Sequence, residues 1–189
     1  MLDALIVGGD SQIGKALAEK LRSLGWNTAT TTRKWPPTEP GGDVLPFDLR
    51  WPTYLPQAKV TYFSTGINGF KPCDVDPEEA KRINVTLLLA VARRLAYTTR
   101  LVFLSSSAAE THPLTVYGQC KLAAERGFVE FGGTCFRFGP VAFPGRNVYP
   151  NEIYSPMNLS TLTRVLSGCL HTWKPKQVHS LYNRDWKPE

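Results

Sequence analysis

The chain has 189 residues, of which 42% are hydrophobic and 20% charged, and its formal net charge is +6. This length suits one domain with a substantial core, and the basic residues are too scattered to favour nucleic-acid binding as the main role. No apolar run reaches the roughly 20 residues that a bilayer-spanning helix needs, so we expect no membrane segment.

Strand-like and helix-like segments alternate along the chain, a pattern typical of a parallel sheet flanked by helices. The apolar run at 4–7 predicts a first strand rather than a signal peptide, because no basic segment precedes it and glycines follow it. Helical spacing of apolar residues then predicts a helix from Ile13 to Leu24. Further strands are predicted at 27–32, 44–47, 60–64, 101–104, 134–138 and 178–182. Further helices are predicted at 77–95, with Asp76 as its N-cap, and at 115–130 and 159–170. Loops are predicted at 35–42 and 140–156.

The four cysteines form no Cys-x-x-Cys pair, and they show no Cys/His spacing that would suit a metal site. We therefore predict free thiols and no metal, which favours a reducing, cytoplasmic environment. The cysteines are Cys73, Cys120, Cys135 and Cys169.

A glycine-rich turn joins the first predicted strand to the first predicted helix. Glycines at such a turn let the backbone approach a pyrophosphate, and the helix start offers free N–H groups and a positive dipole end. The turn therefore predicts dinucleotide binding on a Rossmann-like fold, and an ordinary glycine turn is the alternative. Its residues are Gly8, Gly9, Asp10, Ser11, Gln12, Ile13 and Gly14. Ser11 can either cap the predicted helix or donate to a phosphate.

Two further positions concern the choice of nucleotide. Arg33 and Lys34 follow the second predicted strand, where an acid would hold the ribose 2′-hydroxyl of NAD and a base accommodates the 2′-phosphate of NADP. No acid occupies 30–35, so the sequence favours NADP, with NAD possible and two solvated charges as the other interpretation. After the third strand, Asp48 and Leu49 are candidates to hold the adenine ring, unless Asp48 caps a turn.

Tyr117 and Lys121 lie four residues apart in a predicted helix, so both can project into one site. A neighbouring ammonium favours the phenolate, which would make Tyr117 a usable general acid or base. Ser107 ends the preceding strand and is placed to hold a substrate carbonyl. The spacing occurs often by chance, and its catalytic interpretation depends on the dinucleotide turn upstream.

In this order, the motifs resemble the extended short-chain dehydrogenase/reductase family, which includes nucleotide-sugar epimerases, dehydratases and reductases. The resemblance extends over residues 4–146 through GGxxxIG, Asp-Leu, Ser-Thr-Gly, Asn-Val, Ser-Ser-Ser, YxxxK and Arg-Phe-Gly-Pro. It implies a catalytic set of Ser107, Tyr117 and Lys121, with Asn84 matching the family's helix asparagine. It also implies cofactor contacts at Gly8, Ser11 and Gly14 (pyrophosphate), at Asp48 and Leu49 (adenine), at Thr65, Gly66 and Tyr117, at Lys121 (ribose) and at Pro140 (nicotinamide).

The chain departs from the family pattern in three places. Ser11 replaces the middle glycine of the turn, and the segment between Ser107 and Tyr117 is shorter than in most sugar-modifying members. Family members also carry a long substrate-binding region after Arg-Phe-Gly-Pro, which here is reduced to a loop around 144–156. We therefore expect a single domain over 1–189, in which 140–189 is a reduced substrate-side region.

The sequence thus predicts an α/β, doubly wound, mainly parallel sheet with helices on both faces. The predicted function is NADP(H)-dependent oxidation or reduction of a carbonyl or hydroxyl group, on a small substrate such as a sugar or nucleotide sugar. Two alternatives remain: a non-catalytic NAD(P)-binding sensor or scaffold, which the reduced lobe favours, and an NAD-dependent epimerase or dehydratase. The resemblance further implies a homodimer formed by the helices at 77–95 and 115–130.

Overall fold

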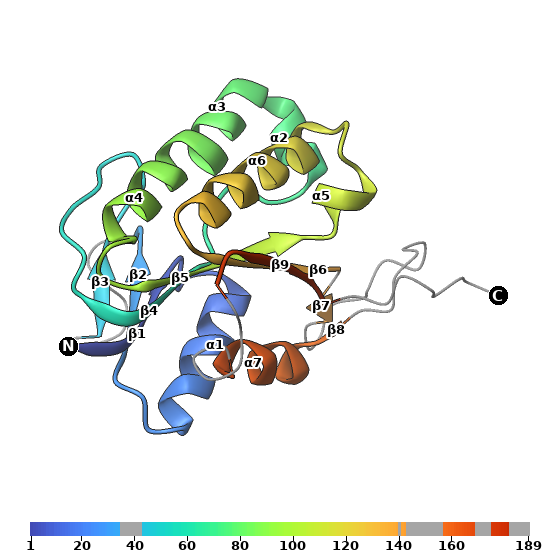
Figure 1. Ribbon diagram of the computed structural model, residues 1–189. Helices are drawn as coiled ribbons and strands as arrows, with labels where there is room; N and C mark the ends of the chain where they lie inside the picture. Colours follow the sequence, from blue (N-terminus) through green and yellow to red (C-terminus); the bar gives the residue numbers. More distant parts are fainter. Residues whose placement is uncertain (35–42, 140, 143–156, 169–174, 182–189) are drawn as a thin grey trace.

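The computed structural model describes residues 1–34, 43–139, 141–142, 157–168 and 175–181 (Figure 1). Its centre is a seven-stranded sheet in the order β3-β2-β1-β4-β5-β6-β9, and every neighbouring pair is parallel. The predicted mainly parallel α/β sheet is confirmed. The strands are β1 (Leu2–Val7), β2 (Thr28–Thr32), β3 (Val44–Pro46), β4 (Ala58–Phe63), β5 (Arg100–Ser106), β6 (Thr134–Phe138) and β9 (Gln177–Ser180); a separate parallel pair joins β7 (Val141–Ala142) and β8 (Met157–Asn158).

Helices cover both faces of the sheet, as Figure 1 shows. One face carries α1 (Gln12–Ser23) and α7 (Leu159–Ser167), and the opposite face carries the remaining helices. Successive residues of a strand point to opposite faces, so β1 supplies both cores. Ala4 and Ile6 pack towards α1 and α7, whereas Leu5 and Val7 pack in the other core with Phe103 and Phe128. The helices of that second face are α2 (Phe70–Val75), α3 (Pro77–Lys81), η1 (Arg82–Leu87), α4 (Leu88–Leu95), α5 (Ala108–Thr111) and α6 (Val116–Glu130).

The order of the strands reverses between β1 and β4. From β1 the chain builds the sheet outward through β2 and β3, and it then returns to place β4 on the other side of β1. In open α/β sheets, ligands bind at the carboxyl ends of the strands beside such a reversal. The topology therefore directs attention to the loops after β1 and β4.

The single helix predicted at 77–95 is interrupted by a π-helical segment, η1. Asp76 does cap its start by accepting a hydrogen bond from the Glu79 amide (2.9 Å), as the sequence predicted. A π-helical turn contains about one residue more than an α-helical turn, and the spacing of apolar residues does not reveal it. The hydrogen bonds of Asn84, in η1, go to Ile67 in a separate segment. Helix α2 was also not predicted, and its six residues are too few to show a helical repeat.

The apolar surplus of the helix at 77–95 is directed mainly at the sheet. Leu88 and Val91 are buried in the core, and Leu87 and Leu89 pack against it while half-buried. The three cysteines in the described part of the chain are free and buried, as predicted, and Cys169 lies outside it. Burial raises the pKa of the Cys73 and Cys120 thiols. In the same residues, no helix is long and apolar enough to cross a membrane, and no group of His, Cys, Asp and Glu could hold a metal.

Candidate functional site

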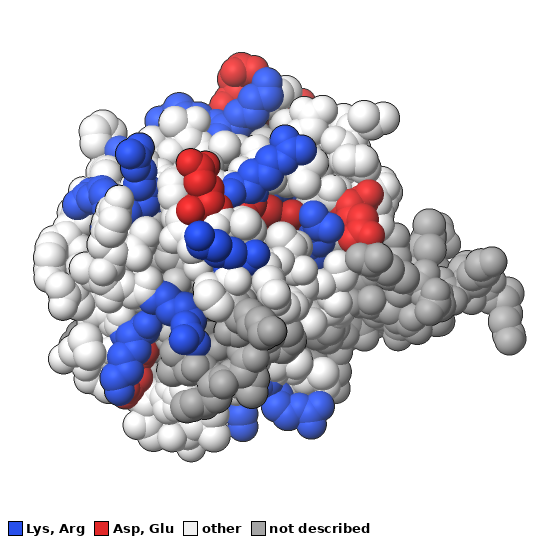
Figure 2. All heavy atoms as spheres, in the orientation of Figure 1, with Lys and Arg blue, Asp and Glu red and all other residues white. Residues whose placement is uncertain are grey.

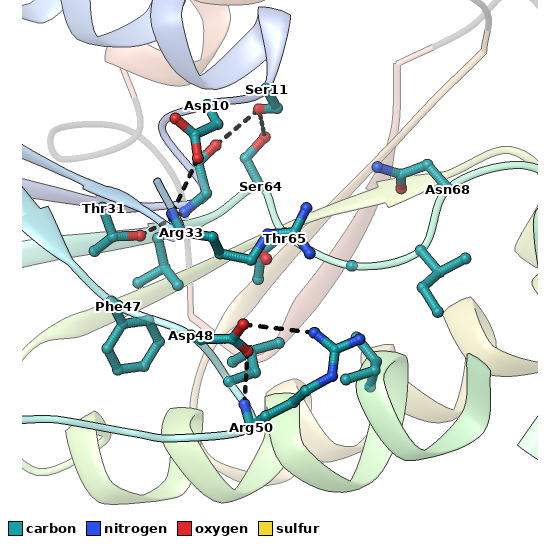
Figure 3. A pocket seen from close by; sticks show the side chains of 16 residues that line it. Asp10, Ser11, Thr31, Arg33, Phe47, Asp48, Arg50, Ser64, Thr65 and Asn68 are labelled. Carbon is teal, nitrogen blue, oxygen red and sulfur yellow. Dashed lines mark hydrogen bonds and ion pairs between the residues drawn. The ribbon is translucent and has the colours of Figure 1, made fainter. Parts of the chain in front are cut away.

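A cleft of about 360 Å³ opens at the carboxyl ends of β1, β2, β3 and β4, beside the reversal of strand order. Its size lies within the range of roughly 300–1,000 Å³ that small-molecule sites occupy. Figure 3 shows its lining side chains. Of the predicted cofactor residues, the lining includes Gly8, Ser11, Arg33, Asp48, Leu49, Thr65 and Gly66.

The glycine-rich turn forms the floor of the cleft and is tied to β2. The Gly8 amide donates to the Thr31 hydroxyl (2.9 Å) and the Gly9 amide donates to the Thr31 carbonyl (2.9 Å). Gly8 has a φ of +97°, and a Cβ there would lie 2.5 Å from the Ser64 carbonyl oxygen, so only glycine fits. The backbone of the turn therefore packs directly against Ser64, the residue that follows β4.

Ser11 stands where the family has its middle glycine, and its side chain is fully engaged. Its Oγ accepts from the Gly14 amide (2.9 Å), donates to the Gly8 carbonyl (2.9 Å) and lies 2.7 Å from the Ser64 Oγ. Ser11 is thus the N-cap of α1, one of the two roles predicted for it. With Gly14 capped, the amides of Gln12 and Ile13 are the candidates to donate to a ligand phosphate.

Arg33 and Lys34 differ in their position relative to the cleft. Arg33 lines it, and in Figure 3 its side chain extends from the end of β2 across the cleft towards Thr65. Within the described chain, its guanidinium makes no hydrogen bond or ion pair. Lys34 is exposed and does not belong to the lining. Of the two predicted basic residues, only Arg33 therefore faces the cleft.

Asp48 caps a turn, one of the two roles that the sequence left open, and its place in the cleft leaves adenine binding as a prediction. It lines the cleft, and its Oδ1 also accepts from the Arg50 amide (2.8 Å), which caps the turn after β3. Arg50, which the sequence reading missed, also lines the cleft and pairs with Glu79 (3.0 Å) and Asp48 (3.5 Å). Hydrogen bonds from Arg82 and Arg50 hold the pKa of Glu79 below its ordinary value. The negative charges of Asp48 and Glu79 are thus both paired with the Arg50 guanidinium.

Asn84 is buried in η1 and does not line the cleft. Its Oδ1 accepts from the Ile67 amide (2.7 Å) and its Nδ2 donates to the Ile67 carbonyl (2.8 Å). Both ends of the amide are therefore used to hold the loop that follows β4. That loop contributes Thr65 and Gly66 to the lining, so Asn84 acts on the cleft through the backbone it fixes.

Tyr117 and Lys121 lie together on α6, as their spacing predicted. The Lys121 Nζ is 5.6 Å from the centre of the Tyr117 ring and 5.0 Å from that of Phe103. Lys121 is buried, and its Nζ donates to the Leu104 carbonyl at 3.4 Å. No carboxylate in the described chain pairs with this ammonium. Its charge is therefore available to a neighbouring phenolate or a ligand hydroxyl.

Ser107 is brought close to the start of α6 by tight backbone packing. It lies at the carboxyl end of β5, where its amide donates to the Phe138 carbonyl (2.9 Å), and it precedes α5. A side chain at Gly118 would clash with the carbonyls of His112 and Ala108, so α5 and α6 are in direct contact beside Tyr117. Ser107 is buried, and its hydroxyl has no partner among the described residues.

An aromatic cluster that the sequence did not reveal lies against Tyr117. The Phe70 ring, at the start of α2, meets the Tyr117 ring edge-on with 5.6 Å between centres, and the His112 ring at 5.1 Å. Phe70 is 40% exposed, and Leu114 in the same region is 90% exposed. Apolar surface is thus presented to solvent next to the candidate catalytic tyrosine. The cluster forms only because α2 packs against the end of α5 and the start of α6, which lie far from it in sequence.

A buried ion pair anchors α6 behind this region. Glu125 follows Lys121 by four residues and is 2% exposed. Its carboxylate accepts from the Ser105 hydroxyl (2.5 Å) and from Arg137 on β6 (2.6 and 2.9 Å), and Arg137 also pairs with Glu110 (3.1 Å). The hydrogen bonds that Arg137 donates to Glu125 raise the pKa of Arg137 above its ordinary value. A hydrogen bond to β5 and an ion pair with β6 therefore hold α6 against the sheet.

The predicted residues thus fall into two groups along the same edge of the sheet. The cleft gathers the turn, Arg33 and the loops after β3 and β4, whereas Ser107, Tyr117 and Lys121 lie outside its lining. Pro140 and the loop at 144–156 lie outside the described residues. Lining residues that were not among the predicted cofactor contacts include Asp10, Thr31, Arg50, Ser64 and Asn68. The signal for most of them is their place next to a predicted strand end.

No protein-family model matches the chain, and no curated protein matches it. Solved structures do. MoeE5, solved with UDP-glucuronic acid and NAD, aligns with a TM-score of 0.78 at 21% identity, over 96% of this chain and 76% of its own. The dTDP-4-dehydrorhamnose reductase of Bacillus anthracis, solved with NADP, aligns with a TM-score of 0.74 at 16% identity, over 97% of this chain and 76% of its own.

A third solved protein, from Bacillus halodurans, is similar in extent as well as in fold. It aligns with a TM-score of 0.74 at 13% identity, over 99% of this chain and 96% of its own. At these identities the comparisons show the fold. The chain has the Rossmann-like fold that these proteins share, so the resemblance stated from the motifs is confirmed at the level of the fold.

Proposed function

We propose that the chain is an NADP(H)-dependent oxidoreductase of the extended short-chain dehydrogenase/reductase type. Its substrate would be a small sugar-like molecule with a carbonyl or hydroxyl group. The observation that carries the proposal is the buried Lys121 ammonium beside the Tyr117 ring, on the edge of the sheet that also bears the glycine-turn cleft. The nucleotides bound by MoeE5 and by the Bacillus anthracis reductase support a dinucleotide in the cleft.

The chain's own residues suggest a division of roles. When bound, the cofactor supplies or accepts the hydride. The Tyr117 hydroxyl would donate a proton to the substrate oxygen or take one from it. Lys121, whose ammonium lies beside the Tyr117 ring, would hold the cofactor ribose. The Ser107 hydroxyl would hydrogen-bond the same substrate oxygen. Residues 140–189 would form the reduced substrate side of a single domain.

The preference for NADP(H) depends on Arg33. Arg33→Ala should weaken NADPH binding by about 1–3 kcal/mol, the usual value of a charge-assisted hydrogen bond, and should change NADH binding little. Fluorescence titration of both nucleotides measures this. Lys34→Ala is the matched comparison, since it removes the same charge one residue away without touching the lining. Equal losses in the two variants would contradict a specific contact at Arg33.

We also propose that two copies associate through α6 and the helix made of α3, η1 and α4, since two-fold homodimers are the commonest assemblies. Leu87, Leu89, Leu122 and Ala123 are half-buried in the single chain and offer further burial. Sedimentation at micromolar concentration should give twice the 21.1 kDa chain mass. Ala90→Glu, on the exposed face of α4, should shift the equilibrium to monomer without unfolding the chain. A wild-type species of about 21 kDa alone would exclude the dimer.

The second candidate is a nucleotide-binding sensor without turnover. It is favoured because Ser107, Tyr117 and Lys121 all lie outside the cleft lining. A panel of aldehydes, ketones and keto-sugars, followed by NADPH absorbance, separates the two functions. Consumption of NADPH with a keto-sugar is the result expected of the enzyme. NADPH binding with no turnover across the panel supports the sensor.

A further inference from the structure

The second strand carries no acid for a ribose hydroxyl, but the fold brings one to its end from elsewhere. Asp10 belongs to the glycine-rich turn, 22 residues before Thr32. The Thr32 hydroxyl contacts both Asp10 carboxylate oxygens at 2.9 Å, and the Arg33 amide donates to Oδ2 at 3.1 Å. The carboxylate therefore occupies the position next to β2 where a dinucleotide presents its adenosine ribose.

Asp10 remains able to bind a ligand at this position. It is exposed and lines the cleft, and a carboxylate has about four lone-pair sites, which the Thr32 and Arg33 contacts do not exhaust. Asp10 forms no ion pair with the Arg33 guanidinium in the described chain. Figure 3 shows Asp10 directed back towards β2, whereas the Arg33 side chain extends across the cleft. The two opposite charges thus lie at the end of β2 without a direct ion pair between them among the described residues.

The two charges favour different nucleotides. A 2′-hydroxyl is a hydrogen-bond donor, which an acceptor-only carboxylate binds well. A 2′-phosphate is an anion, which a nearby carboxylate repels and an arginine attracts. The chemistry of Asp10 therefore suits the ribose of NAD(H), and that of Arg33 suits the phosphate of NADP(H).

We propose that Asp10 is the specificity-determining residue that opens the cleft to NAD(H) and limits its preference for NADP(H). This inference rests on the proposed dinucleotide-binding function. The wild-type chain should bind both nucleotides, because each finds one partner and NADPH also meets one repulsive charge. The balance between Asp10 and Arg33 then sets the ratio of the two affinities.

Asp10→Asn tests this assignment by removing the charge and keeping the shape. We expect NADPH to bind about tenfold more tightly and NADH about tenfold more weakly, each a change of one charge-assisted contact. Fluorescence titration of NADH and NADPH gives both dissociation constants. Asp74→Asn is the control, since it removes the same charge at an exposed position outside the cleft lining and should leave the ratio unchanged.

The titrations distinguish the role of Asp10 from dinucleotide binding itself. Equal changes for both nucleotides, or an unchanged ratio, would overturn the role of Asp10 while leaving dinucleotide binding intact. Failure of the wild-type chain to bind either nucleotide would reject the proposed function and this inference with it. If Asp10→Asn does not fold, Asp10→Ser provides the same test with a small side chain. The double variant Asp10→Asn/Arg33→Ala, which lacks both charges, should bind the two nucleotides to similar extents.

Discussion

Replacing Tyr117 with phenylalanine should lower the turnover rate by about two orders of magnitude or more, the scale expected for loss of general acid catalysis. The phenylalanine ring keeps the packing on Phe70 and the contact with the Lys121 ammonium, so only the hydroxyl is lost. Nucleotide affinity and thermal stability should therefore stay close to wild type. The measurement is NADPH consumption at saturating substrate, alongside nucleotide titration.

Two companion variants sharpen this result. Tyr97→Phe removes a hydroxyl from a tyrosine that is 89% exposed, and it should not change the rate. Lys121→Met should weaken both nucleotide binding and rate, because the ammonium is proposed to serve the ribose and the phenol. Turnover by Tyr117→Phe at the wild-type rate would reject Tyr117 as the proton donor. If neither variant affects anything but nucleotide affinity, the sensor becomes the better description.

Removing Glu125 should cost about 3–5 kcal/mol of the free energy of unfolding, the usual penalty for leaving one charge of a buried pair without its partner. Glu125→Ala deprives Arg137 of two hydrogen bonds and Ser105 of one, within a region that is nearly closed to solvent. For a chain of this length, the melting temperature should fall by roughly 10 °C. Denaturant and thermal unfolding measure the loss.

Glu130→Ala provides the control, because it removes an exposed acid from the end of the same helix. Its effect should stay within about 0.5 kcal/mol, as for most surface substitutions. Glu110 also pairs with Arg137 and will retain part of the charge balance, which places the expected loss at the lower end of the range. A loss below 1 kcal/mol for Glu125→Ala would show that α6 does not depend on this pair.

The sequence by itself determined the features that depend on neighbouring residues. Alternating strands and helices, the glycine turn at 8–14 and the common face of Tyr117 and Lys121 follow from periods of two and 3.6 residues and from backbone preference. These properties need no knowledge of the remainder of the chain, so they could be predicted. The sequence also predicted the N-caps at Ser11 and Asp76, because capping acts over three residues.

The tertiary structure alone decided which predicted residues face the cleft and what their side chains do. Arg33 faces the cleft while Lys34 does not, and Asn84 uses its amide to hold Ile67, 17 residues away. Asp10 reaches Thr32 across 22 residues, and Arg50 reaches Glu79 across 29. Such contacts depend on where separate strands end in space and on side-chain direction, which local periodicity does not encode. The charge pattern of the site is therefore a property of the folded sheet.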